Sequence, residues 1–252
     1  MLKIEHLTKI YDNGVHALKD VSFEVPDGQF LVIIGLSGSG KSTLLRCINR
    51  LIEPTDGRII WNGIDITAAT DEELRLIRRR IGMIFQQFNL VRRAPVITNV
   101  LAGRLGYTNP MWSLINHFSR EDKLKALEKL ERVGIREKAY IRADQLSGGQ
   151  QQRVGIARAL MQEPELMLAD EPVASLDPAT SHSVMKYLEQ LNREDGITIL
   201  CSLHFLSLAR TYADRIIALK DGRMEFDGDP DEIDDKRFRD IYGEDAVRVE
   251  IA

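Results

Sequence analysis

The spacing of apolar residues predicts that the first third of the chain forms strands joined by turns. Apolar and polar positions alternate over residues 2–11 and 18–25, as in strands with one buried face, and the sequence DNG at residues 12–14 is typical of a hairpin turn. Residues 29–35 are a continuous apolar run, which indicates a strand buried on both faces. A helical pattern follows over residues 41–51, and a second hairpin pattern over residues 57–66.

The middle of the chain, residues 88–160, has a mainly helical pattern. In residues 119–134, Ser119 is suited to cap a helix and Gly134 to end it. Apolar residues recur at helical spacing between them and predict a buried stripe. They are Leu124, Leu127, Leu130 and Val133.

Strand and helix patterns alternate after residue 160. The apolar runs at residues 165–170 and 196–202 predict buried strands, and residues 178–192 predict a helix with Pro178 in its first turn. Residues 215–228 predict a hairpin that turns at Asp221 and Gly222. This alternation predicts an α/β fold, in which a mostly parallel sheet carries helices on both faces.

The composition narrows the possible classes of protein. With 252 residues, 44% hydrophobic and 29% charged, the chain suits one large domain, with room for an inserted subdomain. Its net charge of −4 gives no overall attraction to nucleic acid. No apolar run approaches the ~20 residues that span a bilayer, and the alternating N-terminus predicts no signal peptide. Cys47 and Cys201 lack a metal-site spacing, so we interpret them as core residues of a protein in a reducing cytoplasm.

The sequence GLSGSGKS at residues 35–42 is the clearest chemical motif. Gly35, Gly40, Lys41 and Ser42 match G-x-x-x-x-G-K-[ST], with a predicted strand before and a predicted helix after. In such a loop, glycines let backbone N–H groups close around phosphate oxygens, the lysine reaches the β and γ phosphates, and the serine hydroxyl binds Mg²⁺. The alternative is a glycine-rich turn without a ligand, which this strand–loop–helix context disfavours.

Two further stretches carry groups suited to phosphate chemistry. The predicted strand at residues 165–170 ends in Asp170 and Glu171, which places two carboxylates at the edge of the sheet where ligands bind in open α/β folds. One can hold Mg²⁺ through water and the other can deprotonate an attacking water. The sequence LSGGQ at residues 146–150 opens a helix whose N-terminus suits an anion, although Ser147 and Gln150 also form a capping box that starts a helix without any ligand.

Taken together, these motifs carry a family resemblance. The sequences GLSGSGKST, FQQFNL, LSGGQQQRV, LMLADEP, ASLDP and SLH occur in the order found in ATP-binding-cassette (ABC) ATPases, the motors of membrane transporters. The resemblance covers nearly the whole chain and implies an α/β fold of the P-loop NTPase (RecA-like) type. Its mostly parallel sheet core would carry an N-terminal antiparallel β subdomain and an inserted α-helical subdomain. Residues 1–252 would form a single ABC ATPase domain, with the core and β subdomain in residues 1–87 and 161–252 and the helical signature subdomain in residues 88–160.

The resemblance also implies a role for each motif residue. The catalytic residues would be Lys41, Gln86, Glu171 and His204, with Glu171 as the base and His204 as the sensor of the γ-phosphate. The Mg²⁺ ligands would be Ser42, Gln86 and Asp170. The residues that bind ATP would be Tyr11, Gly35, Ser37, Gly38, Ser39, Gly40, Lys41, Ser42, Thr43, Ser147, Gly148, Gly149, Gln150 and Asp177.

Some of these residues also have a purely structural interpretation. Asp177 precedes Pro178 and is a good helix N-cap, His204 can be a hydrogen-bonded histidine at a strand end, and Tyr11 can be an aromatic residue of a hairpin. Their joint occurrence in the order of the family favours the functional interpretation.

The resemblance also explains the second candidate anion site at LSGGQ, since in the family this sequence faces the ATP of a partner chain. One ATP has one γ-phosphate, which the loop at residues 35–42 already surrounds from one side. The resemblance therefore implies a two-fold homodimer with composite sites, which ATP and Mg²⁺ close and hydrolysis opens.

Within the family, the chain is most similar to the ATP-binding subunit of phosphonate importers. The similarity lies in TNVLAGRLGY, KAYIRADQLSGGQQQRV, EPVASLDPATS and LNREDGITILCSLH, whereas Phe205 and the sequence VRRAPV depart from that subfamily. It implies integral-membrane permease subunits as partners, a substrate-binding protein as an indirect partner and no nucleic acid. It also implies a peripheral position on the cytoplasmic face of the inner (cell) membrane.

Two surface features and the class of transporter stay open. An apolar cluster predicts either a local core or part of a docking surface, and comprises Met111, Trp112, Leu114, Ile115 and Phe118. A basic cluster predicts a solvated helix face or a contact with anionic lipid, and comprises Arg75, Arg78, Arg79 and Arg80. The alternative functions are the motor of a phosphate, phosphite, amino-acid or export system, a soluble ABC ATPase outside transport, and a non-catalytic nucleotide sensor.

Overall fold

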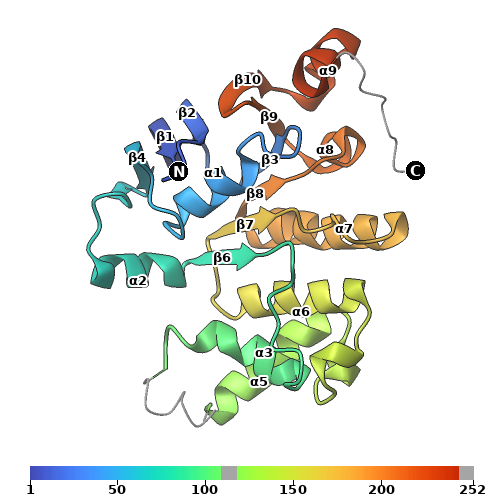
Figure 1. The fold of residues 1–252 in the computed structure, drawn as a ribbon. Helices are drawn as coiled ribbons and strands as arrows, with labels where there is room; N and C mark the ends of the chain where they lie inside the picture. The colour runs from blue at the N-terminus through green and yellow to red at the C-terminus, as the bar shows by residue number, and fades with distance from the viewer. Residues whose placement is uncertain (109–117, 244–252) are drawn as a thin grey trace.

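The computed structural model describes residues 1–108 and 118–243. Within these residues, the central element is a six-stranded sheet with the strand order β10-β9-β3-β8-β7-β6 (Figure 1). Neighbouring strands are parallel except β10, which pairs antiparallel with β9 at one edge. The strands are β3 (Phe30–Ile34), β6 (Ile81–Ile84), β7 (Leu166–Asp170), β8 (Thr198–Ser202), β9 (Arg215–Lys220) and β10 (Arg223–Gly228).

Strand β3 is buried on both faces, as its continuous apolar run predicts. Phe30, Val32 and Ile34 belong to a core cluster formed with the helices α6 and α7 on one face of the sheet. Leu31 and Ile33 point the other way and join a second cluster with the helix α1 and a smaller sheet. Because successive side chains of a strand point to opposite faces, β3 contributes to two separate cores.

The smaller sheet is antiparallel and has the strand order β2-β1-β4-β5. Its strands and β3 enclose the second core together with α1, which leads directly from the glycine loop after β3. The elements are β1 (Leu2–Ile10), β2 (His16–Val25), α1 (Lys41–Ile48), β4 (Asp56–Trp61), β5 (Ile64–Asp65) and α2 (Asp71–Arg79). Both N-terminal hairpins are confirmed.

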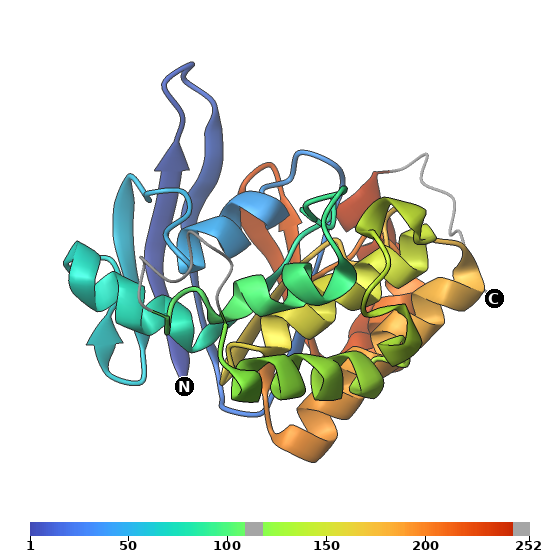
Figure 2. The same cartoon turned by 90° about the horizontal axis from the view of Figure 1, so that it is seen from below.

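Helices α3, α5 and α6 form a layer that extends away from the large sheet beyond its β6 edge (Figures 1 and 2). Helices α3 and α5 pack against α6, and α6 packs against β6 and α7. The layer comprises α3 (Val96–Leu101), α5 (Arg120–Arg132) and α6 (Gly148–Leu160). The helices α7 (Pro178–Asp195), α8 (Leu206–Tyr212) and α9 (Asp235–Tyr242) pack nearer the strands of the sheet. Short 3-10 turns lie at Ala102–Arg104, Arg136–Lys138, Ala143–Gln145 and Pro230–Glu232.

The predicted helix ends are confirmed by hydrogen bonds. The Ser119 side chain accepts from the Asp122 backbone N–H at the start of α5, and the Asp177 side chain accepts from the Thr180 N–H at the start of α7. Gly134 follows α5 with φ +72°, a conformation that glycine adopts without a Cβ penalty. Cys47 and Cys201 are buried free thiols, as expected for core residues.

The structure corrects one expectation about the surface and refines another. Leu124 is 58% exposed, whereas the other predicted positions are covered: Leu130 and Val133 are buried, and Leu127 packs against the core. The basic cluster is not a fully solvated face, since Arg78 donates to the backbone carbonyl oxygens of Asn49 and Arg50. Burial lowers the pKa of Arg78.

The apolar cluster near residue 115 lies almost entirely outside the described residues. Phe118 is described and is 4% exposed, in the core cluster with α5 and α6, whereas residues 109–117 are not described. No helix of the described residues has the length and hydropathy needed to cross a membrane.

Candidate active site

The loop between β3 and α1 is built on backbone conformations that favour glycine. Gly35 has φ +145°, and a Cβ on it would lie 2.2 Å from the carbonyl oxygen of Leu219. Gly40 has φ +108°, and its Cβ would lie 2.4 Å from the carbonyl oxygen of Ala17. Any larger residue at either position would force the loop away from β9 or β2. The two glycines therefore fix how closely the loop wraps against the core.

Lys41, the first residue of α1, directs its ammonium group back into this loop. Its Nζ donates to the carbonyl oxygens of Gly35 at 2.8 Å and Leu36 at 3.0 Å, and the side chain is 3% exposed. Burial lowers the pKa of Lys41, and the nearby carboxylates of Glu171 and Asp170 oppose that shift. The closer carboxylate oxygen, Glu171 Oε1, is 3.9 Å from Nζ. A buried ammonium with this environment is suited to an added anion.

Asp170, at the end of β7, is fully buried and accepts several hydrogen bonds. The Ser42 hydroxyl donates to Oδ1 at 2.7 Å, and the Ser202 hydroxyl donates to the same oxygen at 3.3 Å. The Arg46 guanidinium donates to Oδ2 at 3.0 Å. Helix α1 and the neighbouring strand β8 thus hold one carboxylate and one hydroxyl together at the carboxyl edge of the sheet. Oxygen donors of this kind are the ligands that Mg²⁺ prefers.

Glu171, the residue after Asp170, contacts His204. His204 Nε2 lies 2.6 Å from Glu171 Oε1, and the Glu171 side chain is 11% exposed. Glu171 has a positive φ of 48°, and its backbone N–H donates to the Ser202 hydroxyl at 2.9 Å. Asp170 is held by Ser42, Ser202 and Arg46, whereas Glu171 contacts His204. The two adjacent acids therefore have different surroundings, as different chemical roles require.

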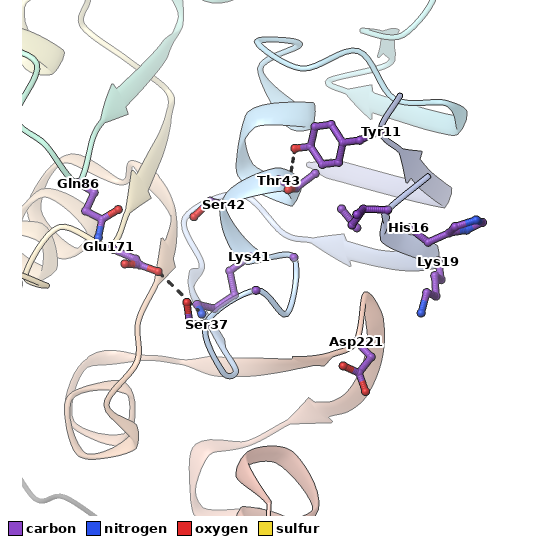
Figure 3. A pocket seen from close by; sticks show the side chains of 14 residues that line it. Tyr11, His16, Lys19, Ser37, Lys41, Ser42, Thr43, Gln86, Glu171 and Asp221 are labelled. Carbon is purple, nitrogen blue, oxygen red and sulfur yellow. Dashed lines mark hydrogen bonds and ion pairs between the residues drawn. The ribbon is translucent and has the colours of Figure 1, made fainter. Parts of the chain in front are cut away.

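A cavity of about 680 Å³ opens over the glycine loop (Figure 3). It joins Tyr11 at one end with Glu171 and Gln86 at the other, and the Tyr11 hydroxyl is 3.1 Å from the Thr43 hydroxyl. The predicted site residues in its wall are Tyr11, Ser37, Gly38, Gly40, Lys41, Ser42, Thr43, Gln86 and Glu171. The structure therefore brings together residues from the first hairpin, the glycine loop with the start of α1, the Gln86 segment and the position directly after β7.

Sequence reasoning missed part of this wall. Val15, His16, Ala17, Lys19 and Asp221 also line the cavity. Val15 precedes β2, three of the others lie in β2, and Asp221 lies in the β9–β10 hairpin turn. This turn is linked to the site by the hydrogen bonds from Lys19 N to the Gly222 carbonyl and from Gly222 N to the Ser39 carbonyl. The pattern of a hairpin predicts its turn but not what the turn contacts.

The LSGGQ residues lie elsewhere, at the start of α6. Ser147 and Gln150 form the predicted capping box, in which the Ser147 Oγ accepts from the Gln150 N–H and the Gln150 Oε1 accepts from the Ser147 N–H. A Cβ on Gly149 would lie 2.3 Å from Thr180 Cγ2, so this helix start is packed against the start of α7 and its cap Asp177. Ser147, Gly148, Gly149, Gln150 and Asp177 are not among the residues that line the 680 Å³ cavity.

Comparisons with known proteins identify the family of the chain. A protein-family model described as ABC transporter matches residues 18–174. The phosphonates import ATP-binding protein PhnC of Bdellovibrio bacteriovorus is 58% identical over 250 residues, which cover 99% of this chain and 96% of that protein. The protein of the same name from Bacillus thuringiensis subsp. konkukian is 51% identical over 251 residues, covering 100% of this chain and 98% of that protein.

Solved structures extend the similarity to the fold. A dimeric ATP-binding cassette in a post-hydrolysis state, bound to ADP and Pi, is 40% identical with a TM-score of 0.79, covering 91% of this chain and 99% of that chain. A nucleotide-free ATP-binding cassette from an ABC transporter is 29% identical with a TM-score of 0.81, covering 96% of this chain and 94% of that chain. The chain belongs to the ABC transporter family and has the P-loop α/β fold of its ATP-binding cassettes.

Proposed function

We propose that the chain is the ATP-hydrolysing subunit of a phosphonate importer. The observation that carries the proposal is a cluster of charged residues at the 680 Å³ cavity. Lys41 and Glu171 lie in the cavity wall, and Asp170 and His204 contact the wall residues Ser42 and Glu171. The chain is also 58% identical, over nearly its full length, to a phosphonate import ATP-binding protein. The cluster supports hydrolysis, and the similarity supports the substrate class of the transporter.

The residues present fit ATP and Mg²⁺. The loop has the glycine conformations of a phosphate cradle, and Ser39 Oγ is buried in it without a hydrogen-bond partner among the described residues. Ser42 and Asp170 offer adjacent oxygen atoms for Mg²⁺, with Gln86 in the same cavity wall. When bound, Mg²⁺ supplies positive charge next to the phosphate oxygens.

The chain's own residues perform the remaining tasks. Lys41 binds the β and γ phosphates, and Tyr11 lies at the opposite end of the cavity, where its ring can stack on adenine. Glu171 accepts a proton from the attacking water, and His204, 2.6 Å away, orients Glu171 and contacts the γ-phosphate. Because Glu171 is only 11% exposed, few waters compete with the one that reacts.

The remaining predicted residues act in a second copy of the chain. The α6 N-terminus with its orphan N–H groups suits a γ-phosphate, yet it does not line the cavity of its own chain. Two copies in head-to-tail arrangement would place Ser147 and its neighbours over the partner's nucleotide. Dimeric cassettes at 40% identity support this arrangement.

The helices α3, α5 and α6 would then form the signature subdomain within residues 88–160, and the two sheets the core and β subdomain within residues 1–87 and 161–252. The direct partners would be integral-membrane permease subunits, and a substrate-binding protein would act through them. The chain would lie peripherally on the cytoplasmic face of the membrane.

Uptake measurements test the proposal. The chain is produced with a phosphonate permease and its binding protein, in cells that lack other uptake systems, and a radiolabelled alkylphosphonate is supplied. We expect uptake with the parent chain and none with Glu171→Gln. Uptake of phosphate but not of the phosphonate would assign the substrate to a different class, and uptake undiminished by Glu171→Gln would overturn the hydrolytic assignment.

A further inference from the structure

The C-terminal helix α9 contacts the segment that carries His204. Tyr242 is the last residue of α9, and its hydroxyl donates to the backbone carbonyl oxygen of His204 at 3.3 Å. His204 lies between the end of β8 at Ser202 and the start of α8 at Leu206. Its imidazole Nε2 is the atom that lies 2.6 Å from Glu171 Oε1. Tyr242 therefore contacts the backbone of His204, one of the two residues of the proposed catalytic pair.

Helix α9 is also held in place by contacts that do not involve the Tyr242 hydroxyl. Arg210 in α8 donates to the carbonyl oxygen of Ile233, and Lys220 in β9 donates to that of Asp240. Phe238 and Ile241 are buried in the large core cluster, and the Phe238 and Tyr242 rings lie 4.8 Å apart. Removal of the hydroxyl alone should therefore leave α9 docked.

The Tyr242 hydroxyl is a stable donor. Burial raises the pKa of Tyr242 far above neutral pH, so the phenol keeps its proton. Its acceptor belongs to the peptide group that links His204 to Phe205, so the bond restrains the backbone from which the His204 side chain extends. Without this hydrogen bond, the backbone of the short connection between β8 and α8 has one restraint fewer.

We propose that Tyr242 is a positioning residue for hydrolysis, which fixes the His204 peptide and thereby holds the imidazole against Glu171. Helix α9 then supports the active site through the hydrogen bond from Tyr242 to His204. This inference rests on the proposed role of His204 and adds a residue that touches neither nucleotide nor metal.

A matched pair of tyrosines provides the test. Tyr212 in α8 makes a bond of the same kind, from its hydroxyl to the backbone carbonyl oxygen of His182 at 3.3 Å, and also contacts His182 Nδ1 at 3.1 Å. Tyr242→Phe and Tyr212→Phe each remove one hydroxyl and keep the ring. The chain has five histidines, so their imidazole signals can be assigned in a ¹H–¹³C NMR spectrum of the full chain.

We expect Tyr242→Phe to move the His204 signal and to lower kcat for ATP by about fivefold, the effect of one neutral hydrogen bond, with KM unchanged. Tyr212→Phe should move the His182 signal and leave kcat at the parent value. Melting temperatures should fall by similar amounts in the two variants, which separates positioning from general stability.

Two results would overturn the inference. One is a His204 signal that Tyr242→Phe leaves in place, and the other is a kcat no lower than that of Tyr212→Phe. Glu171→Gln is measured alongside them. If Glu171→Gln hydrolyses ATP at the parent rate, the proposed function fails, whereas an inactive Glu171→Gln with a fully active Tyr242→Phe rejects the positioning role alone.

Discussion

Lys41 shows what the structure adds to a motif at the scale of a single residue. The sequence predicts that its ammonium group binds phosphate, but not that the group is held by the carbonyl oxygens of its own loop. These are neutral acceptors, and the nearest carboxylate oxygen is 3.9 Å away. A phosphate oxygen can therefore replace or join them without breaking a strong ion pair.

Replacing Lys41 by Ala should weaken ATP binding by about 10- to 100-fold, because a hydrogen bond to a charged group contributes roughly 1.5–3 kcal/mol. Titration of the full chain with a fluorescent ATP analogue measures the effect. Lys186→Ala, which removes an exposed lysine from α7 outside the cavity wall, is the control and should bind like the parent. Equal affinity in the two variants would contradict the assignment of the loop.

At the scale of elements, the helix caps show which parts of the fold a sequence encodes locally. Ser119, Ser147 and Asp177 were each predicted to start a helix, and each accepts a hydrogen bond from the N–H three residues on. Such bonds depend on a few consecutive residues, as hairpin turns do, so the pattern alone is sufficient to predict them.

Contacts between distant segments could not be predicted in this way. The cavity wall includes Lys19 and Asp221, more than two hundred positions apart in the numbering, and nothing local to either residue indicates their meeting. The contact of Tyr242 in α9 with His204 likewise joins distant segments, and no local pattern indicates it. Leu124 fits the helical spacing of α5 but faces solvent, because tertiary packing decides which side of a helix is covered.

The Asp177 cap makes stability depend on pH. Hydrogen bonds from the Thr180 side chain and backbone lower the pKa of Asp177 in the folded protein. A lowered folded pKa stabilises the fold above the ordinary aspartate pKa, and this stabilisation is lost as the pH falls through the folded pKa.

Asp177→Asn keeps a capping oxygen but does not titrate. In urea unfolding, the parent should be more stable than Asp177→Asn at about pH 7, and the difference should shrink toward about pH 3, below the ordinary aspartate pKa. Asp177→Ala, which lacks a cap at every pH, serves as the reference for complete loss. A difference between parent and Asn variant that stays constant over this range would show that the charge does not contribute.

At the scale of the whole molecule, the two helix starts that we propose to bind phosphate lie on different parts of the surface. The N-terminus of α1 closes the 680 Å³ cavity, whereas that of α6 is outside its wall and is packed against the start of α7. One chain therefore provides half of each proposed hydrolytic site. This division explains why bound ATP would hold two copies together and why its hydrolysis would release them.

The oligomeric state of Glu171→Gln tests this central claim most directly. With ATP and Mg²⁺, light scattering coupled to size-exclusion chromatography should show a dimer, because nucleotide is bound but not cleaved, and ADP should give a monomer. In this background, Ser147→Asp should remain monomeric, since aspartate keeps the α6 cap but repels the partner's γ-phosphate. Ser119→Asp, the same change at the cap of α5, should still dimerise. A Glu171→Gln variant that binds ATP yet stays monomeric, or a dimer unaffected by Ser147→Asp, would contradict the composite site.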